Sequence, residues 1–261
     1  MSLAFRSFPF DGLTAVVTTR YGGVSEGPYA TLNLADHVGD EPGAVRENRD
    51  RVAAALGVES LTGMDQQHTA HVHVVTAAEA GTGHHGGGFP ATDALVTDVP
   101  GIALTVVVAD CRPVVLWDAG HCAVGVAHCG RNGILGGIVD ATLAAMRERF
   151  GSTEVVAGIG PGIAGCSYEV GADEIRAFDA AFPDVPGLLA PTRPGHARLD
   201  LLAALRHQLR DIPTQVLPGD TYTDPDLFSH RRERPCGRFA LVAVIDQRAP
   251  APGPGLRHTS R

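Results

Sequence analysis

The chain contains no lysine, so all 21 of its basic residues are arginine. This absence excludes mechanisms that need a lysine side chain, such as Schiff-base catalysis and phosphate binding by a P-loop lysine. The formal net charge is −8, and the sequence has no block of like charges. Because binding to a nucleic-acid backbone depends on clustered cations, nucleic acid is not an expected partner.

Long hydrophobic runs are also missing. No apolar run approaches the ~20 residues of a transmembrane helix, and the N-terminal MSLAFRSFPFDG lacks the features of a signal peptide. We therefore expect no membrane partner and a cytoplasmic location. Cysteine is scarce and odd in number, unlike a disulfide framework, which favours reduced thiols or metal ligands; the five cysteines are Cys111, Cys122, Cys129, Cys166 and Cys236.

The composition is that of a loop-rich folded protein, with 44% apolar and 19% charged residues, 32 glycines and 18 prolines. The length of 261 residues suits one large domain or two small ones. No break in composition longer than a loop divides the chain, so we expect one domain over 1–247. The remaining 248–261, RAPAPGPGLRHTSR, has too little apolar content to pack and is predicted to be a mobile tail.

Hydrophobic patterns predict strands interleaved with helices, which is typical of a layered α/β or α+β domain. Several of the strands are apolar at nearly every position, which indicates that both of their faces are covered. One helix has Asp40 as its expected N-cap and Gly57 as its stop. The predicted strands are 14–19, 72–76, 102–108, 113–117, 122–127 and 239–245, and the predicted helices are 41–56, 136–149, 172–182 and 200–211.

Three side chains that can bind a metal lie at strand ends or beside turns: His68 in QQHT, Cys111 in ADC and His128 in AHCG. Two imidazoles and one thiolate suit zinc, and three protein ligands leave a fourth position for water or substrate, as in catalytic zinc sites. The spacings of 43 and 17 residues contain no short ligand pair. The pattern alone therefore leaves open that Cys111 is a small buried hydrophobe and that the histidines are ordinary polar residues.

Other histidines lie close together in the sequence. His71 and His73 form an H-x-H pair on a predicted strand, but multicopper oxidases need several such pairs and a blue-copper site. His84 and His85 lie in GTGHHGGG, which is interpreted as a flexible, solvent-exposed loop.

Seven stretches spread over most of the chain form a characteristic set. They are TTRYGGVSEGPYATLNLADHVGDEPGAVRENR (18–49), QQHT (66–69), TDALVTDVPGIAL (92–104), ADCRPVVLWD (109–118), AHCGRNGILGGI (127–138), GIGPGIAGCSYEVG (158–171) and FSHRRERPCGR (228–238). Together and in this order they resemble the polyphenol oxidase family, also called laccase-domain or YfiH-like proteins. The resemblance implies an α/β fold of the YfiH-like type, a layered α/β/α-type sandwich.

The resemblance also implies a function. Members of the family are described as cytoplasmic zinc-binding purine nucleoside phosphorylases that also deaminate adenosine and cleave methylthioadenosine. By resemblance, His68, Cys111 and His128 are the metal ligands and the catalytic residues, and purine nucleosides and phosphate are the substrates. Zinc is the expected cofactor, with copper as the alternative because Cys and His ligands suit both metals.

Phosphorolysis requires a phosphate oxygen to attack the anomeric carbon of the ribose, and arginine suits phosphate because its fork matches two oxygens. Arg20 and Arg49 are the candidate phosphate-binding residues. Ser25 and the backbone amides of GGVSEG are a candidate anion nest. The alternatives are a loop salt bridge for Arg20, a solvated helix face for Arg49 and a turn for Ser25.

The chain departs from the family where H-A-G-W-R-G is usual, since Arg131 and Asn132 replace the Trp and Arg. Asn132 cannot supply the charge of the usual arginine. Three alternatives therefore stay open: a metal-free thiol hydrolase or deamidase with Cys111 as nucleophile and His128 as base, a copper-dependent polyphenol oxidase, and an inactive homologue that binds nucleoside or metal. The H-x-E and P-C-x-x-C pattern of known zinc deaminases is absent, so any deamination uses a different scaffold. The sequence does not indicate the oligomeric state.

Overall fold

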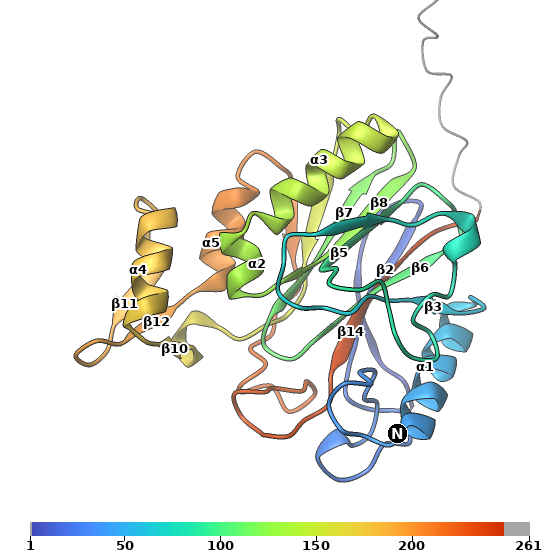
Figure 1. Ribbon diagram of the computed structural model, residues 1–261, viewed down its shortest axis with the longest axis horizontal. Helices are drawn as coiled ribbons and strands as arrows, with labels where there is room; N and C mark the ends of the chain where they lie inside the picture. The colour runs from blue at the N-terminus through green and yellow to red at the C-terminus, as the bar shows by residue number, and fades with distance from the viewer. Residues whose placement is uncertain (1, 248–261) are drawn as a thin grey trace, which may run out of the picture.

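Two β-sheets packed face to face form the centre of the molecule in the computed structural model, which describes residues 2–247 (Figure 1). The tail predicted at 248–261 lies outside the described residues. The five-stranded sheet has the order β1 (Phe5–Phe8), β2 (Leu13–Thr18), β14 (Phe239–Ile245), β6 (Ala103–Val108) and β3 (Leu61–Thr62). The six-stranded sheet has the order β13 (Thr214–Val216), β9 (Val156–Ile159), β7 (Arg112–Asp118), β8 (Ala123–Cys129), β5 (Ala94–Thr97) and β4 (Val72–Val74).

The core lies on both faces of each sheet because side chains alternate along a strand. On β14, Leu241 and Ala243 face a cluster between the sheets, which includes Val115 and Val126 of the six-stranded sheet. The alternate residue Val242 lies in a second cluster, on the outer face of the five-stranded sheet. This double coverage is why 239–245 is apolar at every position.

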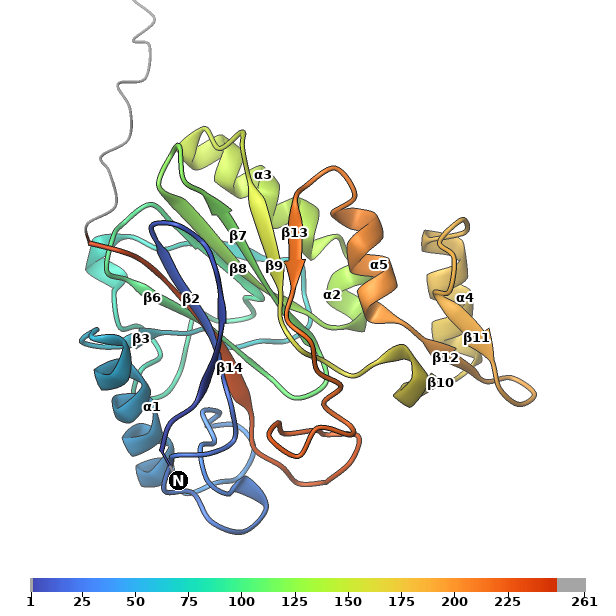
Figure 2. The same ribbon diagram turned by 180° about the vertical axis from the view of Figure 1, so that it is seen from behind.

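Helices cover the two outer faces. The helix α1 (Pro42–Leu56) packs on the five-stranded sheet, whereas α2 (Arg131–Leu135), α3 (Ile138–Phe150) and α5 (Leu201–Gln208) pack on the six-stranded sheet (Figures 1 and 2). The layered α/β class is thus confirmed, and its middle is a pair of sheets, so the layers are α/β/β/α. A strand that is apolar on both faces packs equally well against a helix or a second sheet, which is why the sequence did not distinguish the two.

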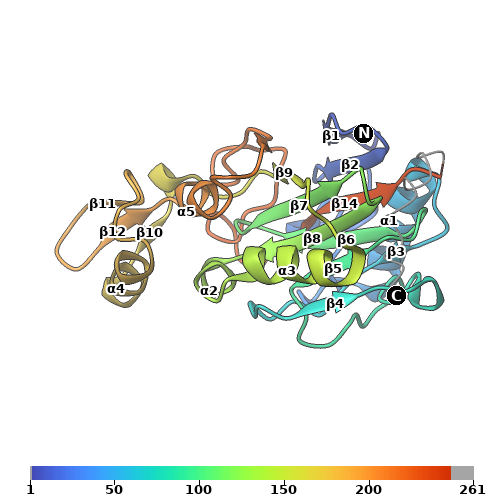
Figure 3. The ribbon, with the colours of Figure 1, turned by 90° about the horizontal axis from the view of Figure 1, so that it is seen from above.

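A smaller lobe extends from the sheets. It contains α4 (Ala172–Ala181) and a three-stranded sheet of β10 (Glu169–Val170), β12 (Ala197–Leu199) and β11 (Leu189–Pro191). All three views show this lobe at the end of the molecule away from α1 (Figures 1, 2 and 3). The short 3₁₀ helices are η1 (Gly27–Tyr29), η2 (Ala77–Glu79) and η3 (Gly165–Ser167).

The first helix matches its prediction with one correction. It begins at Pro42 with Glu41 as its N-cap, and it ends at Gly57, which adopts the left-handed conformation common at helix ends. The expected N-cap, Asp40, instead accepts hydrogen bonds from Ser25 Oγ (2.6 Å) and Asn33 Nδ2 (2.9 Å). None of the helices in residues 2–247 has both the length and the apolar character needed to cross a membrane.

Candidate metal centre and its pocket

Three side chains distant in the sequence converge at one edge of the sheets. His68 lies in the connection from β3 to β4, Cys111 lies between β6 and β7, and His128 lies near the end of β8. Their potential ligand atoms all lie within 4.8 Å of one another, and the two imidazole centroids are 4.7 Å apart. We refer to these three residues as the His–Cys–His cluster.

Asp93, which directly precedes β5, orients this cluster. Its buried carboxylate accepts a hydrogen bond from His128 Nδ1 at 2.8 Å, which leaves Nε2 of His128 as the nitrogen available to a metal. The same carboxylate accepts the backbone N–H groups of His68 (3.0 Å) and Thr69 (2.6 Å). Burial opposes the charge of Asp93, but the hydrogen bonds from His128 and Thr69 outweigh it and lower its pKa to about 2.

The two imidazoles have opposite electrostatic environments. Burial lowers the pKa of His128, but interactions with Cys111 and Asp93 outweigh it and raise the pKa to about 9. The pKa of His68 is lowered by burial and then by the positive charge of His128. Cys111 and Asp93 therefore favour a positive charge within the cluster. A proton on His128 disfavours a second proton on His68.

The local backbone is shaped so that the ligands can meet. His68 has a φ of 60° and Asp110, next to Cys111, has a φ of 91°, a region that non-glycine residues seldom adopt. A Cβ atom at Gly130 would lie 2.4 Å from His68 Nδ1 and 3.0 Å from Cys111 Sγ. The cluster therefore requires glycine at this position. The close approach of these ligand atoms agrees with their binding one ion together.

One cavity opens beside the cluster, and a second cavity adjoins the first. The first, of about 420 Å³, is lined by the cluster and by residues that include Asp110, Arg131, Asn132, Tyr168, His230, Arg231, Arg234 and Arg238. The second, of about 290 Å³, contains Arg49 and shares His37, Gln66 and Val107 with the first. The first cavity is the candidate substrate pocket because the cluster forms part of its wall.

The predicted substrate-binding residues are not brought together with this cluster. Arg49 lines the second cavity, where its Nε donates to Leu34 O (2.9 Å) and its Nη1 to Gly83 O (2.8 Å). Ser25 Oγ is buried and donates to Asp40. The hydrogen bonds of both side chains are thus made within the protein.

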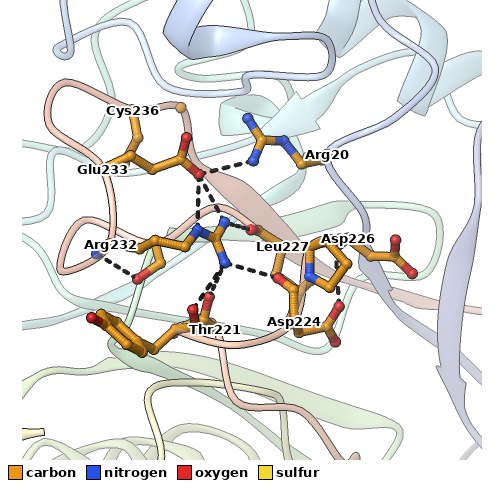
Figure 4. Close-up of polar contacts among 12 residues, drawn as sticks. Arg20, Thr221, Asp224, Asp226, Leu227, Arg232, Glu233 and Cys236 are labelled. Atoms are coloured by element: carbon orange, nitrogen blue, oxygen red, sulfur yellow. Dashed lines mark hydrogen bonds and ion pairs between the residues drawn. The ribbon is translucent and has the colours of Figure 1, made fainter. Parts of the chain in front are cut away.

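Arg20 holds the segment 220–236 in place (Figure 4). Its Nη1 contacts Glu233 Oε1 at 2.8 Å, and Glu233 in turn pairs with Arg232 at 2.7 Å. Arg232 Nη groups donate to the backbone oxygens of Thr221 and Leu227, each at 2.6 Å. The salt bridge of Arg20, one of the alternatives for this residue, is therefore present.

The altered positions Arg131 and Asn132 both line the pocket. Arg131 Nη1 forms an ion pair with Glu174 Oε1 at 2.5 Å, and its guanidinium lies 5.9 Å from the Tyr168 ring. The charge of Arg131 is thus partly neutralised by α4, and Asn132 brings none.

The interpretation of GTGHHGGG as an exposed loop is wrong for His84, which is buried. Leu61 N–H donates to His84 Nδ1 at 3.0 Å, which places the ring proton on Nε2, 2.8 Å from Asp50 Oδ1. Asp50, His84 and His85 also have donor atoms within 4.8 Å of one another. A metal on Nε2 would have to displace that proton, so the structure favours a hydrogen-bonding role for this group.

Several residues of the metal centre and its pocket were not identified from the sequence. Asp93 occurs in TDALV, where a carboxylate directly precedes a buried strand, a signal that could have marked it. Tyr168 and the arginines of 228–238 lie in irregular segments without periodicity, and only their occurrence in the family-like stretches distinguishes them.

Comparisons with known proteins identify the family of the chain. A family model described as multi-copper polyphenol oxidoreductase laccase matches residues 14–246. A purine nucleoside phosphorylase of Corynebacterium glutamicum is 41% identical over 240 residues, covering 90% of this chain and 95% of the relative. The crystal structure of YlmD from Geobacillus stearothermophilus has a TM-score of 0.87 at 33% identity, covering 92% of this chain and 94% of its own. The hypothetical protein YfiH of Bacillus licheniformis has a TM-score of 0.86 at 31% identity, with 93% and 99% covered.

Proposed function

The chain belongs to the YfiH-like, laccase-domain family, and on that premise we propose that it is a purine nucleoside phosphorylase. The observation that carries the proposal is the His–Cys–His cluster in the wall of a pocket of about 420 Å³, within the size range of small-molecule sites. The names of its curated relatives support the reaction class.

We propose zinc as the metal, held by His68, Cys111 and His128. Two nitrogens and one sulfur suit zinc, with a fourth position left for substrate. The absence of a Cβ at Gly130 and the hydrogen bond from His128 to Asp93 support the fit, because a metal-bound histidine usually donates its other N–H to such a partner. When bound, zinc supplies a Lewis acid beside the substrate. Copper has an affinity for the same donors, and metal analysis separates the two.

In phosphorolysis a phosphate oxygen forms a bond to C1′ of the ribose while the bond from C1′ to the purine nitrogen breaks. The base leaves with the electron pair of that bond and takes up a proton. The protein must therefore hold a neutral nucleoside and an anion in one pocket and exclude water as the competing nucleophile. The enclosing residues from β8, the lobe and the segment 228–238 are arranged around one cavity, as this task requires.

The test is a product assay on metal-quantified protein, with adenosine, inosine and guanosine supplied with and without phosphate. We expect free base and ribose 1-phosphate only when phosphate is present. Cys111→Ala should lose both zinc and activity, whereas Cys166→Ala, which changes an exposed cysteine, should keep both. No product from any nucleoside at full zinc occupancy would overturn the proposal.

The same assay tests the further activities that we propose for this site. Inosine formed from adenosine without phosphate would reveal deamination, and methylthioadenosine supplied with phosphate would reveal its cleavage. The phosphate-binding roles of Arg20, Ser25 and Arg49 also stay predictions. Arg49→Ala tests one of them: it should weaken phosphate use more than nucleoside binding, and an unchanged phosphate dependence would contradict the role of Arg49.

A second candidate function is thiol hydrolysis, because Cys111, His128 and Asp93 are arranged like a nucleophile, a base and an orienting carboxylate. A thiolate bound to zinc is not free to attack. Metal-free protein that hydrolyses an amide, and loses this activity on zinc addition, would favour this candidate over the phosphorylase.

A further inference from the structure

Three arginines of the segment 228–238 line the same pocket as the His–Cys–His cluster: Arg231, Arg234 and Arg238. This concentration of positive charge is unusual in a protein with a net charge of −8. Within residues 2–247 none of the three forms an ion pair with a carboxylate, whereas Arg232 between them pairs with Glu233. The three charges are therefore available to a ligand.

Each of these arginines retains N–H donors that no acceptor in the described part of the chain uses. Arg231 donates a hydrogen bond from Nη1 to Glu169 O (2.9 Å), and Arg234 donates one from Nε to His230 O (3.0 Å). Arg238 uses Nη1 for Cys236 O (2.8 Å) and Gly237 O (3.0 Å). At least two nitrogens of each guanidinium thus have no protein partner, and each side chain is fixed by the nitrogen that has one.

Within the described residues, none of the three guanidinium groups pairs with another polar side chain of the pocket. Asp110 also lines it, but its Oδ1 accepts the hydroxyls of Thr221 (2.6 Å) and Ser229 (2.7 Å), and its Oδ2 accepts Arg231 N–H (2.6 Å). Burial, followed by the charges of Arg238 and Arg234, lowers the pKa of His230. The positive potential of the two arginines therefore reaches this neighbouring ring.

Hydrogen bonds and a ring contact hold the segment that presents the three arginines. Arg232 is not among the residues that line the pocket, and its guanidinium lies in the network of Figure 4, where it donates to backbone oxygens of 221–227 and to Glu233. The guanidinium carbon of Arg231 lies over the ring of Tyr168, 4.8 Å from the ring centroid. A preorganised group of donors binds an anion at less entropic cost than flexible side chains do.

We propose that Arg231, Arg234 and Arg238 form the binding site for a phosphate group beside the His–Cys–His cluster. A tetrahedral anion offers several acceptor oxygens, and guanidinium forks match them in pairs. A nucleoside is neutral and gives no reason for three unpaired cations. This inference rests on the proposed function and identifies free orthophosphate, the second substrate, as the occupant.

The experiment measures binding of inorganic phosphate to the zinc-loaded protein by calorimetry, together with KM values for phosphate and for inosine. In Arg234→Gln and Arg238→Gln we expect phosphate affinity to fall about tenfold each, the effect of losing a charge-assisted hydrogen bond. KM for inosine should stay within about twofold. Arg149→Gln, which removes an exposed charge from α3, is the matched control and should change neither. Arg234 is itself exposed, so its variant should fold normally.

The outcomes separate this inference from the proposed function. Unchanged phosphate affinity in both variants, with phosphorolysis intact, would overturn the arginine site and leave the enzyme assignment standing. Arginine-dependent phosphate binding without phosphorolysis would support the site while overturning the assigned activity. Tighter, arginine-dependent binding of AMP than of adenosine, with no effect on free phosphate, would assign the site to a nucleotide phosphate and overturn the choice of orthophosphate.

Discussion

A single buried carboxylate, Asp93, fixes two of the three candidate metal ligands. Its carboxylate accepts one hydrogen bond from the imidazole of His128 and another from the backbone N–H of His68. We expect Asp93→Asn to weaken zinc binding about 10- to 100-fold, because partners of metal-bound histidines contribute that much to affinity. Competition with a chromophoric chelator measures the change. Asp98→Asn, at an exposed position directly after β5, is the control, and equal zinc affinity in both variants would contradict the role of Asp93.

Gly130 is needed because its neighbours occupy the place of a side chain. A methyl group there would collide with His68 Nδ1 and Cys111 Sγ. We expect Gly130→Ala to lower zinc occupancy well below one ion per chain, measured by mass spectrometry of the metal. Gly43→Ala is the control because nothing lies within 4 Å of its new Cβ, and in α1 it should stabilise by up to about 1 kcal/mol. Full zinc occupancy in Gly130→Ala would disprove the steric argument.

At the scale of elements, the segment 220–236 depends on one side chain for its shape. Arg232 donates to Thr221 O, Asp224 O and Leu227 O, so its loss leaves three carbonyl groups without this partner. We expect Arg232→Gln to cost about 1–3 kcal/mol, which lowers Tm by roughly 2–12 °C for a chain of this length. Arg193→Gln breaks only an exposed ion pair and should cost less than about 1 kcal/mol. An equal fall in Tm in the two variants would contradict the proposed role of Arg232 in shaping this segment.

The elements differ in how well the sequence foretells them. The strand 239–245 is predicted to the residue because every position is apolar and both faces are buried. The strands β5 and β9 were missed, since four residues between turns carry little periodicity. The His–Cys–His cluster followed from resemblance, but Asp93 was not identified, because the position of a carboxylate before a buried strand does not show which side chains it contacts. Arg231, Arg234 and Arg238 lie in a family-like stretch, but only the folded segment shows that all three line the pocket.

For the molecule as a whole, stability should fall in acid through buried carboxylates such as Asp118. Burial opposes its charge, but hydrogen bonds from Thr153 and His121 outweigh it and lower the pKa. A pKa below the unfolded value of about 3.9 stabilises the fold above that pH and loses the effect as the pH falls through the folded pKa. We expect Asp118→Asn to be about 1–3 kcal/mol less stable at pH 7. Urea unfolding should show this gap narrowing below about pH 4, whereas exposed Asp179→Asn should show no gap. A gap independent of pH would contradict this account.

The position of the cluster couples metal binding to the packing of the two sheets. His68 and Cys111 both lie on connections that cross from the five-stranded to the six-stranded sheet, and His128 lies within the latter. An ion held by all three would join both crossovers to β8, and it would bind only the folded chain, in which the ligands meet. Zinc at about 100 times its Kd should then stabilise the protein by about 2.7 kcal/mol.

Removal of zinc by a chelator should therefore lower Tm by roughly 5–11 °C in the wild-type protein. Differential scanning calorimetry of Cys111→Ala with and without the chelator is the necessary comparison, because that variant should show almost no shift. A chelator effect of the same size in Cys111→Ala would mean that the metal stabilises the protein from another site. No effect in zinc-loaded wild-type protein would mean that zinc does not bind the folded chain in preference to the unfolded one, which would contradict this coupling.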